Sequence, residues 1–575
     1  MSTSVPDAPL APDAPLHARL AAVRRAPTRR HRIANLLLAT AAATVLFLLD
    51  DRLQQWLGGA GNDARLRPDW IAALAVLSAA LWLGGSRWAA NAVLGLFALI
   101  QLCQLSHIAA IGRPLTPLDV AMIPREVSDI LRSARAEAGA QWPTLLAGGL
   151  PYALLFALYN LGLARLPLPR VRWALLAVAL LLASQPYKAA HQGMVRFMPQ
   201  QGHSSLFNAM RAFSYYAVNL IGVQVSRDAP AHPAYRIVAA PTPAPPQAIW
   251  LVIFDSTRLD RWQVAGYPRE TTPNLSSWVR SGDARWHRGI AGAAATRASL
   301  ALLLNGVREP GHLQQLQSHQ SNLFRLAKRA GYRTYWLSTQ YGGDLLERID
   351  TASIDTARSR EDAAVAVAAR GDEAIFDQLD AAAPAPGERR LMVLLLRTAH
   401  LPFEDAYRRL PPRYRRWPDT VAAGAADARQ ARRNAYDNAI AYQDELIARL
   451  YLRFEAMNEQ GLFVVTSDHG QMLGEDGVWG HNVLTPQVAQ VPMLVRARGE
   501  GQRPLAGNGD WLAHHQLHLA LAARLGYRID NPGAVPGLYY LQGSDVYGDN
   551  LYREARAAGA TLELGAPTGL GRPRH

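Results

Sequence analysis

The sequence predicts two folds in series: an N-terminal all-α bundle of five membrane-spanning helices, then an α/β domain with a mostly parallel central sheet. Three observations support this. Long apolar segments are confined to the first third of the chain. Beyond them, short apolar strands alternate with helical patterns, which is typical of a parallel sheet covered on both faces. At 575 residues the chain is also too long for one core.

The N-terminal third begins with a Pro/Ala/Arg-rich segment, residues 1–32, which we expect to be disordered and cytoplasmic. A membrane-spanning helix needs about 20 mostly apolar residues. Five apolar segments within residues 33–190 approach that length, at 33–49, 70–85, 89–111, 145–163 and 173–187. Arginines concentrate before the first span and in alternate loops. The positive-inside rule therefore puts the N-terminus in the cytoplasm and everything after the fifth span outside.

Residues 191–247 connect the spans to the second domain. Apolar side chains at helical spacing over residues 204–223 predict an amphipathic helix, either on the outer membrane surface or packed on the soluble domain. Six prolines between residues 230 and 246 then mark a linker. The α/β domain is expected over residues 248–550, and residues 551–575 are expected to be a tail.

Charge and cysteine content narrow the class of protein. The formal net charge of +14 comes largely from arginine. A nucleic-acid-binding protein would show a basic stripe with interleaved aromatic side chains, and none stands out here. We therefore expect no nucleic-acid partner and contact with membrane lipids; a monomer is expected as well. The single cysteine, Cys103, lies in the third span, so the outer domain depends on its own core without disulfides.

Two predicted strands end in side chains suited to metal ligation. Continuous apolar runs predict strands at 249–254, 334–337, 391–396, 462–466 and 493–495. Asp255 follows the first of these strands, and Asp468 and His469 follow the fourth. Because ligands collect at the carboxyl ends of parallel strands, we expect these three side chains to lie together. Carboxylate oxygens with an imidazole suit zinc or manganese, so the sequence predicts a metalloenzyme.

Further polar side chains follow other strands. Gln340 lies just after the strand at 334–337, His400 after the strand at 391–396, and His481 in the motif Gly480-His481-Asn482 after a Gly-rich loop. A lone histidine is more often a structural residue. Several such groups converging on strand ends nevertheless indicate a functional site.

Thr296 is the candidate nucleophile. It stands between a run of small residues and an apolar helix beginning near Arg297. A hydroxyl at this place meets the positive end of the helix dipole, which suits a phosphoryl group, and a metal would lower its pKa. The local sequence alone favours a plain N-cap. Ser256 and Thr257, directly after Asp255, are rival nucleophiles.

Nearly all of residues 248–500 resemble the phosphoethanolamine transferases (lipid A/LPS-core type) of the alkaline phosphatase/sulfatase superfamily. The matching stretches are Asp255-Ser256-Thr257-Arg258, Gly266-Tyr267-Pro268-Arg269-Glu270-Thr271-Thr272-Pro273, Asn434-Ala435-Tyr436-Asp437-Asn438, Ser467-Asp468-His469-Gly470 and Gln490-Val491-Pro492-Met493. The preceding spans and the outward-facing domain also match. The resemblance implies a zinc-dependent transferase of the bacterial inner membrane, with its catalytic domain in the periplasm.

The resemblance also implies roles for individual residues. The first metal ligands it implies are Asp255, Asp468, His469 and Thr296, the last of which is also the catalytic nucleophile. His400 and His481 fall where the family binds the phosphoryl group or a second zinc, so one or two Zn²⁺ ions are expected. Gln340 falls near a position that contacts the donor head group. The implied donor is phosphatidylethanolamine, and the implied acceptor is lipid A, LPS core or another surface glycan.

The chain departs from the family at several positions. Asp255 stands where the family usually has Glu, Ala294 replaces a Thr, Leu395 a His and Gln471 a Glu, and the cysteines that flank the nucleophile in many members are absent. Two alternatives remain: a phosphoglycerol transferase on the same scaffold and a catalytically inactive membrane-bound binding protein. A sulfatase is disfavoured, because the Cys or Ser precursor of its formylglycine is missing from the required setting.

Overall fold

A computed structural model describes residues 28–56, 67–124, 127–200, 203–220, 232–242, 245–343, 345–346, 348–422, 424, 426–457, 460–499, 505, 509–544, 546 and 551–569. Disorder is predicted for residues 1–32, and residues 1–27 of that segment lie outside the described residues. The chain divides into two compact units. The first comprises Met1–Leu105, Pro143–Gln185 and Gln201–Phe207, and the second comprises Ser106–Trp142, Pro186–Gln200 and Asn208–His575.

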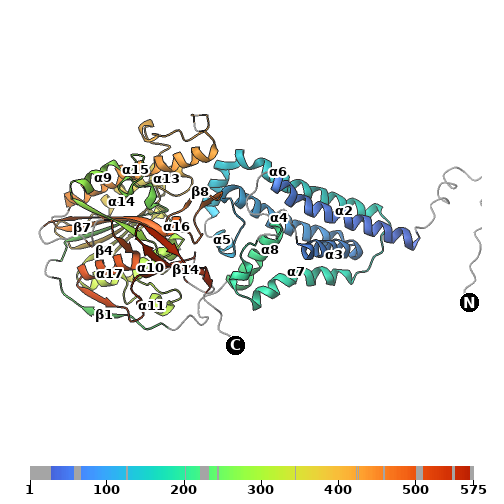
Figure 1. The fold of residues 1–575 in the computed structure, drawn as a ribbon, viewed down its shortest axis with the longest axis horizontal. Coiled ribbons are helices and arrows are strands. Elements are labelled where there is room, and N and C mark those ends of the chain that lie inside the picture. The colour runs from blue at the N-terminus through green and yellow to red at the C-terminus, as the bar shows by residue number, and fades with distance from the viewer. Residues whose placement is uncertain are drawn as a thin grey trace, which may run out of the picture. The chain divides into compact units, whose positions relative to one another are not determined.

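The N-terminal part of the chain is helical, as predicted (Figure 1). The five apolar segments form the helices α2 (Arg29–Trp56), α3 (Pro68–Gly84), α4 (Arg87–Ile111), α6 (Val127–Arg165) and α7 (Ala174–His191). Among the described residues, three helical stretches are long and apolar enough to cross a membrane: Arg29–Asp50, Arg87–Ile111 and Trp142–Arg165. Helix α3 is apolar but only 17 residues long, and α7 turns polar after residue 183. Five spans are therefore not confirmed.

Two shorter helices, α5 (Pro117–Met122) and α8 (Ser205–Tyr215), accompany these spans. Helix α8 and the π-helical turn Tyr216–Leu220 coincide with the predicted amphipathic helix. Ala209, Ala212 and Tyr215 are buried, so one face of α8 is packed against protein. A position on the membrane surface stays a prediction.

An eight-stranded sheet forms the centre of the second unit, in the order β11-β3-β10-β7-β2-β6-β4-β5. Its strands are β2 (Ala248–Phe254), β3 (Ala284–Ile290), β4 (Arg333–Ser338), β5 (Thr356–Arg358), β6 (Arg390–Leu396), β7 (Gly461–Ser467), β10 (Gln490–Arg498) and β11 (Trp511–Ala513). All five apolar runs predicted as strands are strands. The strands from β7 to β5 run parallel to one another, but β10 is antiparallel to both neighbours. The sheet is therefore mixed, because no long crossover helix separates β7 from β10.

Helices cover both faces of this sheet (Figure 1). The helices are α9 (Pro273–Arg280), α14 (Ala374–Ala382) and α15 (Ala428–Met457) on one face, and α10 (Thr296–Asn305), α12 (Leu323–Arg329) and α17 (His514–Arg524) on the other. Trp250 and Val252 of β2 pack into the first core, whereas Leu251 and Ile253 pack into the second. Burial on both faces explains why β2 reads as an unbroken apolar run rather than an alternating one.

The remaining elements lie around this three-layer core. They are α11 (Leu313–Ser318), α13 (Ala364–Arg370), α16 (Pro486–Ala489), the pair β1 (Arg236–Ala239) and β12 (Tyr527–Asp530), and the hairpin β8 (Met472–Glu475) and β9 (Val478–Gly480). Part of the Pro-rich linker is thus a strand, β1, which pairs antiparallel with β12.

Residues 551–569, predicted to be part of a tail, are ordered strands instead. They form β14 (Leu551–Ala558), β15 (Thr561–Leu564) and β16 (Thr568–Gly569), which join β13 (Leu538–Gln542) in a four-stranded sheet. Leu551, Ala555 and Leu562 are buried and anchor these strands. Short strands rich in Arg and Ala give too weak an apolar alternation to be recognised from sequence.

Candidate active site

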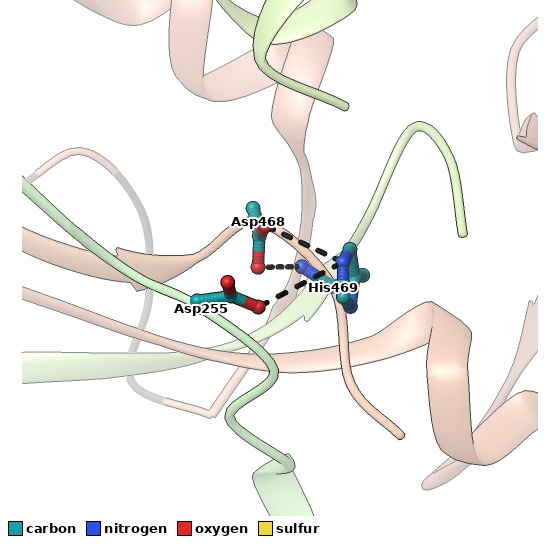
Figure 2. A group of neighbouring side chains, drawn as sticks. All are labelled: Asp255, Asp468 and His469. Atoms are coloured by element: carbon teal, nitrogen blue, oxygen red, sulfur yellow. Dashed lines mark hydrogen bonds and ion pairs between the residues drawn. The ribbon is translucent and has the colours of Figure 1, made fainter. Parts of the chain in front are cut away.

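Asp255, Asp468 and His469 lie together at the carboxyl ends of β2 and β7, as Figure 2 shows. One potential ligand atom from each lies within 4.8 Å of the other two. The grouping follows from the sheet, because β2 and β7 are parallel neighbours with Phe254 opposite Ser467. Both strands therefore end at the same level of the sheet, and the side chains that follow them enter a shared space.

The backbone conformation at this edge directs hydrogen-bond donors toward the two carboxylates. Ser256 adopts a left-handed conformation with φ of 63°, which is uncommon for a residue with a side chain. In this conformation its N–H donates to Asp468 Oδ1 at 3.0 Å, and its hydroxyl donates to Asp255 Oδ1 at 2.7 Å. The N–H of His469 also donates to Asp468 Oδ1, at 2.6 Å. Strained backbone held by such bonds is typical of functional sites.

One carboxylate oxygen of Asp468 is available to a metal ion or a proton. Among the described residues, Asp468 Oδ2 is buried without a hydrogen-bond donor, and it lies 3.4 Å from His469 Nε2. A buried carboxylate oxygen without a donor is costly unless a cation or proton meets it. The three side chains therefore fit a divalent metal on the chemistry of their donor atoms.

His469 presents a lone pair to this space. Its Nδ1 lies 2.9 Å from the carbonyl oxygen of Gly470, and a carbonyl only accepts, so Nδ1 carries the proton. The unprotonated Nε2 lies 3.3 Å from Thr296 Oγ1 and 4.0 Å from Asp255 Oδ1. A backbone-fixed tautomer of this kind is the usual state of a metal-ligating histidine.

Thr296 is the first residue of α10, with Ala295 as the N-cap. The reading of Thr296 as an N-cap is therefore wrong, and its half-buried hydroxyl is directed at His469 instead. The rival hydroxyls are engaged elsewhere: that of Ser256 donates to Asp255, and that of Thr257 donates to Gln443 Oε1 at 3.3 Å. The structure thus brings Thr296 to the ligands at a helix N-terminus, where the dipole favours negative charge.

The two facing carboxylates differ in proton affinity. Burial alone would raise the pKa of Asp255, but His400, His469 and His481 together hold it below its ordinary value. Burial and the neighbouring charge of Asp255 raise the pKa of Asp468 well above its ordinary value. Two like charges at this distance resist ionising together, and a cation between them would remove that conflict.

The other predicted histidines line the same space. The ring centroid of His481 lies 4.5 Å from that of His469 and 5.6 Å from that of His400. His481 Nδ1 lies 3.2 Å from the carbonyl oxygen of Ala294, so its Nε2 carries the lone pair. Gln340 lies at the same edge of the sheet, where its Nε2 donates to the carbonyl of Leu396 at 3.4 Å.

Two supporting contacts, one from His514 and one from Ser299, could not be predicted from the sequence. His514, the first residue of α17, is buried, and its Nε2 donates to the carbonyl of Ser467 at 2.9 Å. The hydroxyl of Ser299 donates to the carbonyl of Asp468 at 2.5 Å. Together they fix the backbone that carries the ligand pair. Nothing in the local sequence distinguishes His514, because it becomes relevant only when α17 packs behind β7.

Arg397 was not predicted as a site residue, although its position in the sequence is unusual. A guanidinium directly after the unbroken apolar strand β6 is unusual, and its Nη2 lies 2.8 Å from His400 Nδ1. Gln471, which stands where the family has Glu, is fully buried and donates to the carbonyl of Ala399 at 2.9 Å. A carboxylate could not donate this bond, so Gln471 ties the loop after β7 to the loop that carries His400.

Comparisons with known proteins identify chains that are similar to this one. Residues 247–519 match the family model described as Sulfatase. Sequence relatives include phosphoethanolamine transferase EptC of Escherichia coli, 26% identical over 231 residues that cover 39% of this chain and 40% of that protein. Another is Kdo(2)-lipid A phosphoethanolamine 7''-transferase of Salmonella typhimurium, 24% identical over 305 residues that cover 50% of this chain and 51% of that protein. The chain thus matches about half the length of these relatives or less.

Among solved structures, the integral membrane protein lipooligosaccharide phosphoethanolamine transferase A (EptA) from Neisseria meningitidis matches with a TM-score of 0.53 and 17% identity. The match covers 90% of this chain and 97% of that one, and at this identity it shows a shared fold. The resemblance to phosphoethanolamine transferases noted from the motifs is confirmed. Over residues 247–519 the α/β domain is therefore similar to the Sulfatase family.

Proposed function

We propose that this chain is a membrane-bound, metal-dependent transferase that moves phosphoethanolamine from phosphatidylethanolamine to lipid A, LPS core or another surface glycan. Transfer proceeds through an intermediate covalently held on Thr296. The names of the sequence relatives support the transferred group, and one of them names lipid A as the acceptor. The observation that carries the proposal is the placement of the Thr296 hydroxyl, 3.3 Å from His469 Nε2, beside two facing carboxylates.

Asp255, Asp468, His469 and Thr296 would hold the metal, for which we propose Zn²⁺. The buried Asp468 Oδ2 without a donor and the lone pair of His469 are the features that suit it. A divalent metal, when bound, supplies positive charge that lowers the pKa of a neighbouring hydroxyl and offsets charge on a phosphoryl group. His400 and His481 offer further imidazole nitrogens, so a second ion remains part of the proposal.

The reaction follows from the placement of the side chains. Thr296 Oγ1 loses its proton and forms a bond to the donor phosphorus, while the bond from phosphorus to the diacylglycerol oxygen breaks. An imidazole, His400 or His481, gives a proton to the leaving oxygen and is restored by the threonine proton. In the second step the oxygen of an acceptor hydroxyl forms a bond to the same phosphorus while the bond from phosphorus to Thr296 Oγ1 breaks, and the acceptor proton passes through the imidazole to Thr296. The N-terminus of α10 and the imidazoles bind the phosphoryl oxygens, and Gln340 contacts the head group.

A lipid donor fits the first part of the chain. In the part of the chain that the structure describes, three helical stretches are long and apolar enough to cross a membrane, which would keep the catalytic domain at a bilayer surface. We place the protein in the bacterial inner membrane, with its N-terminus in the cytoplasm and the catalytic domain in the periplasm. The arginine distribution supports this orientation.

The test is peptide mass spectrometry of the full-length protein after incubation with phosphatidylethanolamine and Zn²⁺ without acceptor. We expect a phosphoethanolamine mass on the peptide that holds Thr296. Thr296→Ala should lose the adduct and all transfer, whereas Thr296→Ser should keep both at a reduced rate. An adduct on Ser256 or Thr257 would refute the nucleophile. An adduct formed only from phosphatidylglycerol would make the chain a phosphoglycerol transferase, and no adduct from either lipid with metal bound would favour the inactive binding protein.

A further inference from the structure

The hairpin β8–β9 connects the two halves of the candidate site. It begins three residues after His469 and ends at Gly480, directly before His481. The position of the His481 imidazole therefore depends on the path of this hairpin. The sequence predicts a Gly-rich loop here, although Asp476-Gly477 is a dipeptide typical of hairpin turns.

The hairpin cannot hold its own shape. It is a two-stranded sheet separate from the eight-stranded one, with an irregular register between Leu473 and Glu475. Four of its residues have positive φ: Gly474, Asp476, Gly477 and Gly480. An isolated two-stranded hairpin is marginally stable at best, so its geometry must come from what it packs against.

The end of α4 packs directly against the tip of the hairpin. Gly112, the residue after α4, has φ of 82°. A Cβ at Gly112 would lie 1.8 Å from the carbonyl oxygen of Gly477 and 2.7 Å from its carbonyl carbon. This is backbone against backbone, so neither side can yield by a change of rotamer. Ile111 approaches the other end of the hairpin, where its Cδ1 would lie 3.3 Å from a Cβ at Gly480.

A second support comes from α15. The guanidinium of Arg432 lies 4.4 Å from the centre of the Trp479 ring, in cation–π geometry. Its Nη1 also donates to the carbonyl of Ala110 at 3.0 Å. Arg433 Nε donates to the carbonyl of Leu473 at 2.9 Å. Arg432 thus joins the last turn of α4 to β9, and Arg433 holds β8.

We infer that Gly112 and Arg432 are positioning residues that hold His481 at the candidate site through the β8–β9 hairpin. The inference rests on the proposed function for its kinetic consequence. Through these contacts the end of α4, a helix that includes a stretch able to cross a membrane, takes part in setting the geometry of the site. A displacement of about 1 Å in a catalytic group can lower a rate by about 10²-fold.

The test uses full-length protein in detergent and compares Gly112→Val with Gly282→Ala. Gly282 has φ of 83° and nothing within 4 Å of a built Cβ, so this control places a side chain at positive φ without a clash. We expect Gly112→Val to lower kcat for phosphoethanolamine transfer by about 10²-fold with little change in KM, and Gly282→Ala to stay within about twofold. In a His481→Ala background, Gly112→Val should add almost nothing, because the group it positions is already gone.

Arg432→Ala is the second variant, in case Gly112→Val does not fold. It should lower kcat, and Arg432→Lys should recover most of the loss because a lysine keeps a cation over the Trp479 ring. Hydrogen–deuterium exchange of residues 472–481 should rise in both loss variants and stay unchanged in Gly282→Ala. A folded Gly112→Val or Arg432→Ala protein with unchanged hairpin exchange and kcat, or effects that multiply with His481→Ala, would overturn the inference. If wild-type protein transfers nothing, the proposed function fails, and the exchange comparison still decides whether these residues hold the hairpin.

Discussion

His514 should make the catalytic domain sensitive to acid. Its imidazole is buried behind β7, and its Nε2 donates to the carbonyl of Ser467, next to the ligand pair. Burial lowers the pKa of His514 from 6.5 to about 4. The perturbation we consider is acidification from pH 6.5 to pH 4, in wild type and in His514→Gln. Glutamine keeps an N–H donor for Ser467 but has no proton to take up.

The sign and the size of the effect follow from proton linkage. Because the pKa of His514 is lower in the folded state, the unfolded chain takes up the proton first as the pH falls. Stability contributed by this group is therefore present above pH 6.5 and is lost progressively down to about pH 4. At about 1.4 kcal/mol for each pKa unit, the full loss is about 3 kcal/mol. His518 has a pKa lowered in the same way to about 4, so the variant should still lose some stability.

The assay is hydrogen–deuterium exchange of the β7 peptide at pH 6.5, 5.5 and 4.5, corrected for intrinsic exchange rates. The opening free energy of wild type should fall more steeply than that of His514→Gln, with the two curves separating by about 2 kcal/mol between pH 6.5 and pH 4.5. His31→Gln, at an exposed position on α2, should follow wild type. Parallel curves for wild type and His514→Gln would refute the assignment of acid sensitivity to this buried imidazole.

Three further outcomes are expected. Chelation of divalent metal should lower the Tm of the catalytic domain, and equal Tm values with and without metal would contradict this. Asp468→Asn should raise the Tm of the metal-free protein and weaken Zn²⁺ binding by at least about tenfold in a competition titration. Ser299→Ala, which removes the hydrogen bond to the Asp468 carbonyl, should cost about 1 kcal/mol in urea unfolding. Gly306→Ala should cost more than Gly331→Ala, because both have positive φ but only the Cβ at Gly306 would clash, at 2.2 Å from His518 Cδ2; equal losses would contradict that reasoning.

The parts of the fold that sequence predicts best are those with a continuous apolar signal. The central strands are buried on both faces, so β2, β6 and β7 read as unbroken runs that end abruptly at polar residues. Their parallel pairing then carries Asp255 and Asp468 to one edge without further information. The grouping of the ligands was predictable because it depends only on strand ends and register.

Other parts depend on contacts that local sequence does not encode. The antiparallel direction of β10 follows from the short connection through β8, β9 and α16. The glycines in and between β8 and β9 kept these two strands from being recognised in the sequence. His514 reaches the site only through the packing of α17 on the sheet. The strands after residue 550 bury only isolated side chains such as Leu551 and Leu562, so their pattern resembles that of an exposed segment.

The close approach of Gly112 to Gly477 means that a fragment of the catalytic domain must include the end of α4 to keep every contact of the β8–β9 hairpin. All strands of the central sheet lie after residue 247, so a soluble fragment cut at the Pro-rich linker retains the sheet and the three ligands. Such a fragment lacks Ala110, Ile111 and Gly112, which belong to the same compact unit as the catalytic domain. From the inferred role of the hairpin we expect His481 to be held less firmly in such a fragment, so inhibitors ranked on the fragment should be ranked again on the full-length protein.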